Sequence, residues 1–354
     1  MARQWKAAVV GTGVVGGWHV GMIPRLPNCS LVAVCDVKPD KAAETLKKNQ
    51  LSGIPVYASV EELLQKQRDV DVVHVCTPSG DHFTPVVSCL EAGKNVICEK
   101  PLEIQLDRID RMVEVSQRTG SRLAAIFQNR WNDANRAIKQ AADDGRFGRI
   151  AWAGSFTPWY RPDKYYEEGG WRGTRRLDGG GAIMNQSVHS IDLLQWICGQ
   201  VKSVSAYAAS RIHAGIEVED TGSAALQFAN GAFGTIVGTT AMFPGMPPRI
   251  EIGGENGTAV SEQGLKMFKF RDERPGDAEL LERLAVTKSR STSGGSSNTD
   301  IGLDLHARNI LHILQSWDEG RDAETSGAEA RKAVAIILAM YESARKGGAA
   351  VQVD

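Results

Sequence analysis

The stretch Gly11-Thr12-Gly13-Val14-Val15-Gly16 decides the fold of the first part of this chain. It directly follows the apolar run 7–10, which is typical of a parallel strand that is covered on both faces. In a strand–turn–helix unit, the first glycine makes the turn, the second lets the backbone approach a pyrophosphate, and the third lets the helix pack on the strand. The sequence therefore predicts a dinucleotide-binding turn, although glycine-rich turns also occur for purely structural reasons.

Asp36 ends a second apolar run and supports this interpretation. It lies 20 positions after Gly16, where an acidic side chain can accept hydrogen bonds from the ribose hydroxyls of an adenosine. A carboxylate there repels a 2′-phosphate, so the sequence favours NAD over NADP as the cofactor, while the nearby Lys38 keeps NADP from being strictly excluded. The alternative is that Asp36 only caps a turn or the next helix.

Apolar runs alternate with amphipathic stretches through residues 1–128. This alternation predicts a doubly wound parallel sheet, and therefore a Rossmann domain. The expected strands are 7–10, 31–36, 70–76, 95–98 and 123–127, and the expected helices between them are 38–49, 60–67, 83–92 and 108–119.

The pattern changes near residue 128, and we expect residues 129–354 to form a second α/β domain with a large open, mainly antiparallel sheet. Short turns such as Asn230-Gly231 separate several segments of strand character. The aromatic and glycine-rich stretch 152–181 is assigned no strand, and the Ser- and Gly-rich segment 289–299 is expected to be a loop. The expected strands are 201–209, 221–228, 232–240, 249–253, 258–261 and 265–270, and the expected helices are 133–144, 184–198, 305–317 and 328–345.

The composition narrows the classes of partner. The 354 residues suffice for two domains, and 41 basic residues nearly cancel 42 acidic ones, so no positive field favours nucleic acid as a partner. No apolar run is long enough to cross a bilayer, and the first residues lack a secretory signal. The six cysteines form no CxxC pair and no metal site is predicted, so we expect buried free thiols in a cytoplasmic protein.

Four further segments extend the pattern set by the glycine motif. They are Thr77-Pro78-Ser79-Gly80-Asp81-His82, Glu99-Lys100-Pro101, the run 179–192 with the spacing GGG-x3-N-x3-H-x2-D, and His306-Ala307-Arg308-Asn309-Ile310. In this order they resemble the glucose–fructose oxidoreductase and inositol dehydrogenase (Gfo/Idh/MocA) family over nearly the whole chain. The resemblance implies an NAD(P)-dependent dehydrogenase or reductase that acts on a sugar, sugar acid, nucleotide sugar or cyclitol. It also implies a homodimer or homotetramer that packs through the C-terminal sheet.

The resemblance assigns catalytic roles to three residues. Lys100 matches the family's catalytic lysine and His189 its catalytic histidine, and the two are expected to meet over the nicotinamide, with His189 as acid/base and Lys100 polarising the same oxygen. An exchange of these roles stays open, and His82 is a further candidate base. Asn185 stands where many members have aspartate, so it can orient His189 or the substrate but adds no charge. The expected cofactor contacts are Gly11, Thr12, Gly13, Val14, Val15, Gly16, Asp36, Thr77, Pro78, His82, Glu99, Lys100 and Pro101.

The segment 159–176 combines aromatic side chains with arginines. Aromatic faces suit the C–H side of sugar rings and guanidinium groups suit carboxylate or phosphate, so a uronate or a nucleotide sugar is one hypothesis. A subunit or domain interface uses the same residue types and is the alternative. The expected substrate contacts are Lys100, Asn129, Arg130, Tyr160, Trp171, Arg172, Asn185 and His189.

Two other functions remain open at this point. An NAD-dependent glycosidase would oxidise its sugar transiently and return the hydride, whereas a non-catalytic protein would only sense the dinucleotide. The presence of both Lys100 and His189 argues against the non-catalytic alternative.

Overall fold

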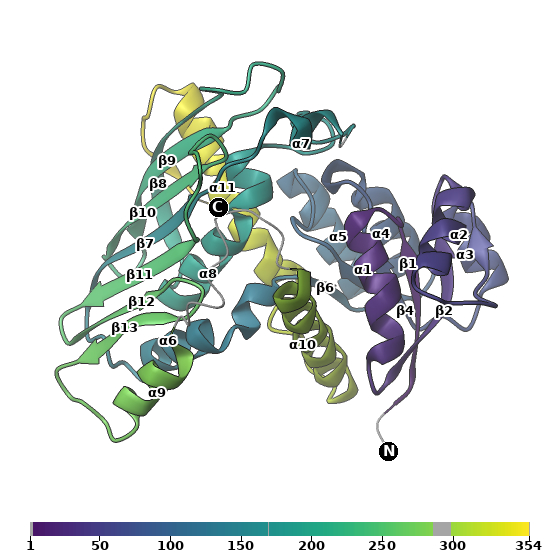
Figure 1. Cartoon of the computed structure of the whole chain (residues 1–354), viewed down its shortest axis with the longest axis horizontal. Helices are drawn as coiled ribbons and strands as arrows, with labels where there is room; N and C mark the ends of the chain where they lie inside the picture. Colours follow the sequence, from purple (N-terminus) through teal and green to yellow (C-terminus); the bar gives the residue numbers. More distant parts are fainter. Residues whose placement is uncertain (1–2, 169, 286–298, 354) are drawn as a thin grey trace. The chain divides into compact units, whose positions relative to one another are not determined.

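The computed structural model describes residues 3–168, 170–285 and 299–353. The chain divides into two compact units, the first formed by residues 1–127 and 299–331 and the second by residues 128–298 and 332–354. The labels of their helices and strands are given in Figure 1.

A six-stranded sheet forms the centre of the first unit. Every neighbouring pair in it is parallel, and the strand order 3-2-1-4-5-6 is that of the Rossmann fold. The predicted doubly wound sheet is therefore confirmed. From edge to edge the strands are β3 (Val56–Tyr57), β2 (Cys29–Cys35), β1 (Trp5–Val10), β4 (Val72–Val75), β5 (Asn95–Cys98) and β6 (Leu123–Ala125).

Capping hydrogen bonds and glycine conformation mark ends of helices in this unit. The side chain of Ser59 accepts a hydrogen bond from the N–H of Glu62 and so caps the start of α3 (Val60–Lys66). Gly120 ends α5 (Leu106–Thr119) in the left-handed conformation, with φ of 71°. The remaining helical segments are α1 (Val14–Met22), η1 (Ile23–Arg25), α2 (Pro39–Lys48), η2 (Ser79–Asp81) and α4 (Phe83–Glu91).

The chain returns to the first unit at α10 (Thr299–Asp318). Ile310, Ile313 and Trp317 of this helix lie in the same buried hydrophobic cluster as the first strand, where Trp5 and Trp317 have ring centroids 5.9 Å apart. This differs from the boundary expected near residue 128, which placed all later residues in the second domain. Local pattern cannot reveal a helix that packs on strands nearly 300 residues earlier in the sequence.

An eight-stranded sheet forms the second unit. Only β7 and β10 run parallel, and the other described neighbours are antiparallel, so the predicted mainly antiparallel sheet is confirmed. From edge to edge the strands are β13 (Leu265–Phe270), β12 (Gly257–Ser261), β11 (Arg249–Gly254), β7 (Ile150–Pro158), β10 (Phe233–Thr239), β9 (Thr221–Phe228), β8 (Val201–Ala209) and β14 (Val351–Gln352).

The strand β7, which lies inside this sheet between β11 and β10, was not predicted from the sequence. Its buried positions include Ala153, Ser155 and Thr157, whereas Trp152 and Phe156 are only partly buried. The usual alternation of apolar inward and polar outward residues is therefore reversed. The hydroxyl of Thr157 is 3.1 Å from that of Ser190 in α8 (Val188–Cys198), so one of these buried polar side chains pairs with that helix.

The remaining helical segments of the chain extend and correct the prediction. The expected helix 184–198 is in fact a short π-helical turn, η4 (Ala182–Gln186), followed by α8 (Val188–Cys198). Residues 289–298 of the expected loop lie outside the described residues. The other segments are η3 (Gln128–Trp131), α6 (Asp133–Asp143), α7 (Asp163–Glu167), α9 (Asp277–Leu284) and α11 (Gly327–Arg345).

Across the described ranges, no helix combines the length and the apolar character that a bilayer crossing requires. All six cysteines are free, and five of them are buried while Cys76 is partly exposed.

Ile313→Ala should lower the free energy of unfolding by about 2–5 kcal/mol, because the fully buried side chain leaves a cavity between α10 and the first sheet. Urea unfolding followed by tryptophan fluorescence measures the change. Gln315→Ala, at an exposed position of the same helix, is the matched control and should change the stability little. Equal effects of the two substitutions would contradict the assignment of α10 to the first core.

Candidate active site

The glycine-rich turn contains two kinds of glycine. A Cβ atom on Gly11 would lie 2.8 Å from the carbonyl carbon of Cys76, and one on Gly16 would lie 1.8 Å from the carbonyl oxygen of Gly11. These two glycines are therefore required by the protein's own backbone. A Cβ on Gly13 would meet nothing closer than the ammonium of Lys41 at 3.9 Å, so this glycine leaves open space.

Gly13 is also the N-cap residue of α1, and no side chain caps the N–H groups there. Val14 and Val15 form the first turn of this helix, and Val14 is exposed. Uncapped N–H groups beside open space form an anion-binding site, where the helix dipole favours negative charge. The pyrophosphate of a dinucleotide therefore fits the turn.

Asp36 is tied to the glycine-rich turn. Its Oδ2 accepts hydrogen bonds from both the N–H and the hydroxyl of Thr12, each 2.8 Å long, and its Oδ1 accepts the N–H of Lys38 at 2.9 Å. Burial opposes ionisation, but these hydrogen bonds, with the charge of Lys41, lower the pKa of Asp36. The carboxylate is therefore ionised at neutral pH and retains acceptor capacity for ribose hydroxyls.

His82 connects two loops at the carboxyl end of the first sheet. Its Nδ1 is 2.9 Å from the carbonyl oxygen of Pro101 and its Nε2 is 2.9 Å from that of Thr77, while Pro78 precedes η2 in the same loop. Burial lowers the pKa of His82. Both ring nitrogens face backbone carbonyls, so this histidine holds the loops together and is poorly placed to act as a base.

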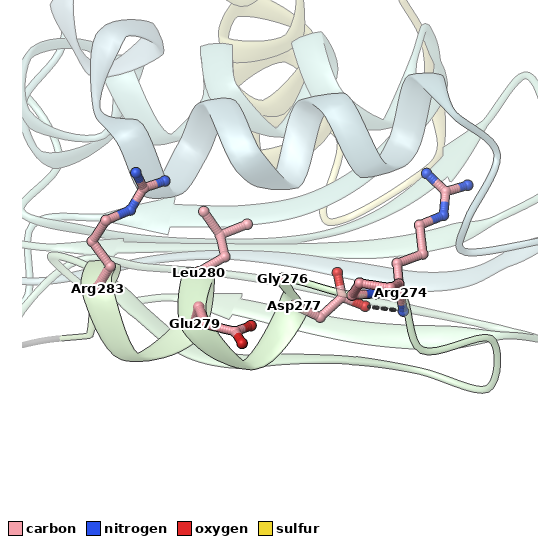
Figure 2. Close-up of a pocket in the computed structure, with 7 residues that line it drawn as sticks. Arg274, Gly276, Asp277, Glu279, Leu280 and Arg283 are labelled. Atoms are coloured by element: carbon pink, nitrogen blue, oxygen red, sulfur yellow. Dashed lines mark hydrogen bonds between the residues drawn. The ribbon is translucent and has the colours of Figure 1, made fainter.

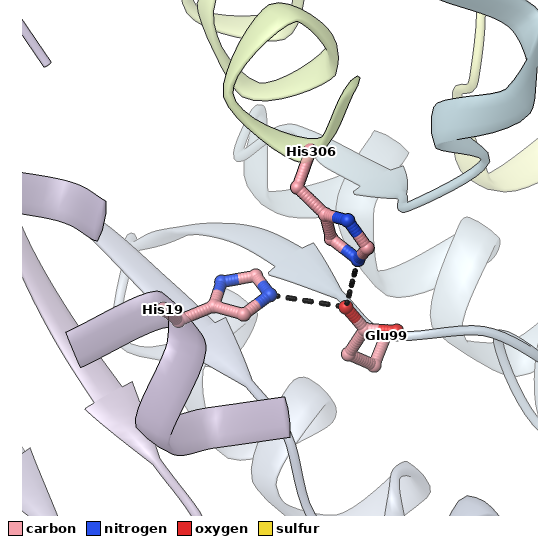
Figure 3. Close-up of side chains that lie close together, drawn as sticks. All are labelled: His19, Glu99 and His306. Atoms are coloured by element: carbon pink, nitrogen blue, oxygen red, sulfur yellow. Dashed lines mark hydrogen bonds and ion pairs between the residues drawn. The ribbon is translucent and has the colours of Figure 1, made fainter. Parts of the chain in front are cut away.

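Glu99 lies in a buried cluster with His19, His74 and His306, and Figure 3 shows its contacts with His19 and His306. Its Oε1 is 3.0 Å from Nε2 of His19 and 3.5 Å from Nε2 of His306, and Nδ1 of His19 is 2.9 Å from Nδ1 of His74. Burial favours the neutral acid, but hydrogen bonds and charge from His19 and His306 hold the pKa of Glu99 well below its usual range. The second oxygen, Oε2, accepts the N–H of Lys100 at 3.2 Å. The cluster therefore anchors the backbone of Lys100.

Sequence analysis expected Glu99 to contact the cofactor and predicted no metal site. The ligand atoms of His19, Glu99 and His306 lie within 4.8 Å of one another, an arrangement that could hold a metal ion. The two imidazole N–H donors and the backbone N–H of Lys100 already satisfy the carboxylate, so the cluster is stable without an ion. These residues are too far apart in the sequence for any motif to connect them.

Lys100 and Pro101 follow the end of β5 after one residue, Glu99, and the peptide bond between Lys100 and Pro101 is cis. This places Lys100 after the carboxyl end of a central parallel strand, where ligands bind in open α/β sheets.

In the second unit, the π-helical turn η4 is held by Glu219. Its Oε1 accepts the N–H groups of Gly181 and Ile183 at 3.0 and 2.8 Å and the hydroxyl of Tyr341 at 2.8 Å. Burial raises the pKa of Glu219. A π turn is rare and is often found at functional sites, and here it carries Asn185.

Asn185 is buried and its amide is fixed on both sides. Its Nδ2 donates to Oδ1 of the buried Asp178, and its Oδ1 accepts Nε2 of Gln186 at 3.1 Å. Neither Asp178 nor Gln186 was predicted, because Asp178 precedes the motif 179–192 and Gln186 occupies one of its variable positions. His189 lies in the first turn of α8, and its Nε2 is 3.5 Å from Nε2 of Gln128.

Arg130 is placed differently from the expected substrate contact. Its guanidinium forms a bidentate ion pair with Asp192, at 2.7 and 2.6 Å, and both side chains are 1% exposed. It also lies over the ring of Trp196. This pair packs α8 against the segment η3. The carbonyl oxygen of Asn129 accepts the side-chain amide of Asn135 at 2.9 Å.

The aromatic segment brings two arginines to one ring. The guanidinium carbon of Arg161 lies 5.0 Å from the centroid of Tyr165, and that of Arg172 lies 4.4 Å from it. Arg172 also lies over Trp171, while Tyr160 contacts Phe243 edge-on. Burial lowers the pKa of Arg161, and the charge of Arg172 acts in the same direction, so the two cations are close enough to interact.

A separate surface pocket lies at α9 (Figure 2). It contains none of the predicted site residues. Its walls are formed by Arg274, Pro275, Gly276, Asp277, Glu279, Leu280 and Arg283.

The Rossmann sheet, its open glycine-rich turn and the ionised Asp36 define an NAD-binding oxidoreductase. The profile of an oxidoreductase family with an NAD-binding Rossmann fold matches residues 5–127, and that of the Gfo/Idh/MocA C-terminal domain matches residues 135–260. The chain belongs to the Gfo/Idh/MocA family of oxidoreductases. The predicted family, the NAD cofactor and the dehydrogenase class are thereby confirmed.

Individual relatives support the same conclusion. The crystal structure of the WlbA dehydrogenase from Bordetella pertussis, in complex with NADH and UDP-GlcNAcA, is 30% identical and superposes with a TM-score of 0.89 over 100% of this chain and 99% of that one. Inositol 2-dehydrogenase from Rhizobium meliloti is 27% identical over 96% of each chain. Myo-inositol 2-dehydrogenase from Thermotoga maritima is 28% identical over 77% of this chain and 79% of its own.

Asp36→Ala should weaken NADH binding by about 10- to 100-fold, because it removes a charged acceptor for the ribose hydroxyls. NADPH binding should weaken less, since the lost carboxylate also repelled the 2′-phosphate. Titration of each cofactor by fluorescence measures both dissociation constants. Asp40→Ala, at an exposed position in the first turn of α2, is the control. An unchanged ratio of the two constants would remove Asp36 from cofactor selection.

Proposed function

We propose that this protein is an NAD-dependent dehydrogenase of a nucleotide-linked sugar that carries a carboxylate. The observation that carries the proposal is the pair of guanidinium groups, Arg161 and Arg172, beside the ring of Tyr165. A relative that matches the full length of the chain, the WlbA dehydrogenase from Bordetella pertussis, is bound to UDP-GlcNAcA, a sugar of this class.

Arg172 is the better candidate to bind the carboxylate. It is partly exposed, its Nη1 donates only weakly to the carbonyl oxygen of Tyr165 at 3.4 Å, and within the described ranges it forms no ion pair. A partly exposed guanidinium over the rings of Tyr165 and Trp171 is pre-organised for bidentate binding of a carboxylate or phosphate. The aromatic rings beside it suit the C–H face of a sugar.

The reaction needs a group that removes the hydroxyl proton of the substrate. Bound NAD supplies the acceptor for the hydride. In this proposal His189 takes the proton from the sugar hydroxyl, and the ammonium of Lys100 donates a hydrogen bond to the same oxygen as negative charge develops on it. Asn185 holds the hydroxyl or the imidazole in place. Lys100 belongs to the first unit and His189 to the second.

The outer face of the second sheet supports assembly into a homodimer or homotetramer. Tyr207, Phe233 and Met267 expose 68%, 63% and 45% of their surfaces, although they lie on strands of the sheet. Large apolar side chains gathered on one face are typical of an interface between subunits. Buried free cysteines fit a reducing, cytoplasmic compartment.

The purified enzyme should reduce NAD when it is given UDP-GlcNAcA, and Lys100→Met should lower kcat by at least about 100-fold because one donor to the developing oxyanion is lost. NADH absorbance measures the rate, and fluorescence titration should show nearly unchanged NADH binding. A parallel assay with aryl glycosides tests the alternative reaction. Glycoside cleavage without net NADH would favour an NAD-dependent glycosidase, and near-normal turnover of the variant would exclude Lys100 from the mechanism.

Arg172→Gln should raise KM for UDP-GlcNAcA by about 10- to 100-fold, the cost of an unpaired carboxylate, and should change KM for UDP-GlcNAc, whose sugar lacks the carboxylate, much less. Steady-state kinetics with both sugars give the ratio of the two kcat/KM values. Arg175→Gln, an exposed arginine of the same segment that contacts Glu217, is the matched control. Equal losses on both sugars would contradict carboxylate recognition by Arg172.

A further inference from the structure

A continuous chain of side-chain hydrogen bonds crosses the second unit from a buried carboxylate to a guanidinium. Asn185 Nδ2 donates to Oδ1 of Asp178, Gln186 Nε2 donates to Oδ1 of Asn185 at 3.1 Å, and Arg161 Nη2 donates to Oε1 of Gln186 at 2.8 Å. Gln186 Nε2 also donates to the hydroxyl of Tyr165 at 2.9 Å. Asp178 is 1% exposed, and Asn185 and Gln186 are buried.

The two ends of this chain determine the orientation of both amides. An ionised carboxylate only accepts hydrogen bonds and a guanidinium only donates them. Asn185 must therefore direct its NH2 group to Asp178 and its oxygen to Gln186, and Gln186 must direct its oxygen to Arg161. If both amides were reversed, an amide oxygen would face the carboxylate and an NH2 group would face the guanidinium, so both ends would be repulsive.

Asp178 is itself held rigidly by the loop that follows Arg172. Its Oδ2 accepts the N–H of Gly173 at 2.8 Å, and its own N–H donates to the carbonyl oxygen of Thr174 at 3.0 Å. The same carboxylate therefore connects the loop after Arg172 to the π-helical turn that carries Asn185. Its charge extends further: burial raises the pKa of Tyr165, and the negative charge of Asp178 adds to that effect.

We propose that Asp178 is a positioning residue that carries the negative charge of the site, while Asn185 relays its orientation as a neutral amide. The proposal rests on the proposed function, because Asn185 is taken to hold the reacting hydroxyl or its base. The order of the pair matters in two ways. With carboxylates at both positions 178 and 185, the contact between them would have no hydrogen to donate. With amides at both positions, the NH2 group at position 178 would face another donor, so one of its two contacts would be lost.

The first consequence concerns Asn185→Asp. This variant places two carboxylates at hydrogen-bond distance, and such a pair binds a proton at a pH where either one alone would be ionised. At high pH the pair is repulsive and the turn is displaced, whereas at low pH a shared proton restores the contact. We therefore expect kcat to fall by at least about tenfold at high pH and to recover as the pH is lowered.

The second consequence concerns the exchange of the two side chains, Asp178→Asn with Asn185→Asp. In this double variant the amide introduced at position 178 can accept the N–H of Gly173 with its oxygen and donate its NH2 group to the carboxylate introduced at position 185. That carboxylate can still accept the NH2 group of Gln186, so the direction of the chain is kept. The double variant should therefore have a higher kcat than either single variant, and it should lose the added pH dependence of Asn185→Asp.

The experiment is a double-mutant cycle of wild type, the two single variants and the exchange variant. It is followed by kcat and KM from about pH 6 to 9 with UDP-GlcNAcA and, separately, by the free energy of unfolding over the same range, because coupling between contacting residues appears as non-additivity. Glu167→Gln, an exposed acidic residue on α7, controls for the loss of one charge. NADH affinity should be the same in all five proteins.

The two readouts separate the possible failures. Non-additive kcat with rescue by the exchange supports the proposal. Additive losses in both kcat and stability, or an unchanged pH profile of kcat in Asn185→Asp, would overturn it. Coupling in stability alone, with kcat unchanged in all variants, would reduce Asp178 to a structural residue and also overturn it. If the wild type turns over no carboxylate-bearing nucleotide sugar, the proposed function fails, and the stability cycle still tests the pairing.

Discussion

The close approach of Gly16 to Gly11 is the contact on which the cofactor site depends. A single methyl group on Gly16 would lie 1.8 Å from the carbonyl oxygen of Gly11, so α1 can begin at this point only because both residues lack a side chain. The uncapped N–H groups at the start of α1 lie beside the open space at Gly13. Asp36 fixes the turn through two hydrogen bonds from Thr12. Cofactor binding is therefore a consequence of how β1 connects to α1, and needs few dedicated side chains.

The first sheet could be predicted because its information is local. Its longer strands contain apolar runs such as Ala7–Val10 and Leu31–Cys35, and Ser59 and Gly120 mark helix ends, so these elements can be located from short stretches of sequence. The same rule failed at β7, where Ser155 and Thr157 are buried and Trp152 and Phe156 are turned outward. It also failed for α10, because its packing against Trp5 depends on residues that are far apart in the sequence.

The candidate site divides in the same way. Lys100, Asn185 and His189 are predicted as site residues because they lie in short motifs, but the supporting role of the residues that hold Lys100 and Asn185 could not be predicted. Glu99 was predicted as a cofactor contact, although its carboxylate is bonded to His19, His306 and the N–H of Lys100. Glu219 and Asp178 lie in no motif, and only the folded turn 182–186 brings them into contact with the candidate site. Polar side chains that support a site are chosen for geometry, which a sequence pattern does not record.

In each unit, a buried carboxylate positions a residue of the candidate site. A buried carboxylate is costly unless every oxygen is hydrogen-bonded, and Glu99 and Asp178 meet this requirement with donors from several segments of the chain. Because the cost of breaking any one contact is large, the segments that supply the donors are held in one arrangement. In the first unit the carboxylate of Glu99 holds the backbone of Lys100, and in the second the carboxylate of Asp178 holds the amide of Asn185. The charge that fixes the backbone of Lys100 and the amide of Asn185 therefore lies on Glu99 and Asp178. Neither Lys100 nor Asn185 has to carry that negative charge itself.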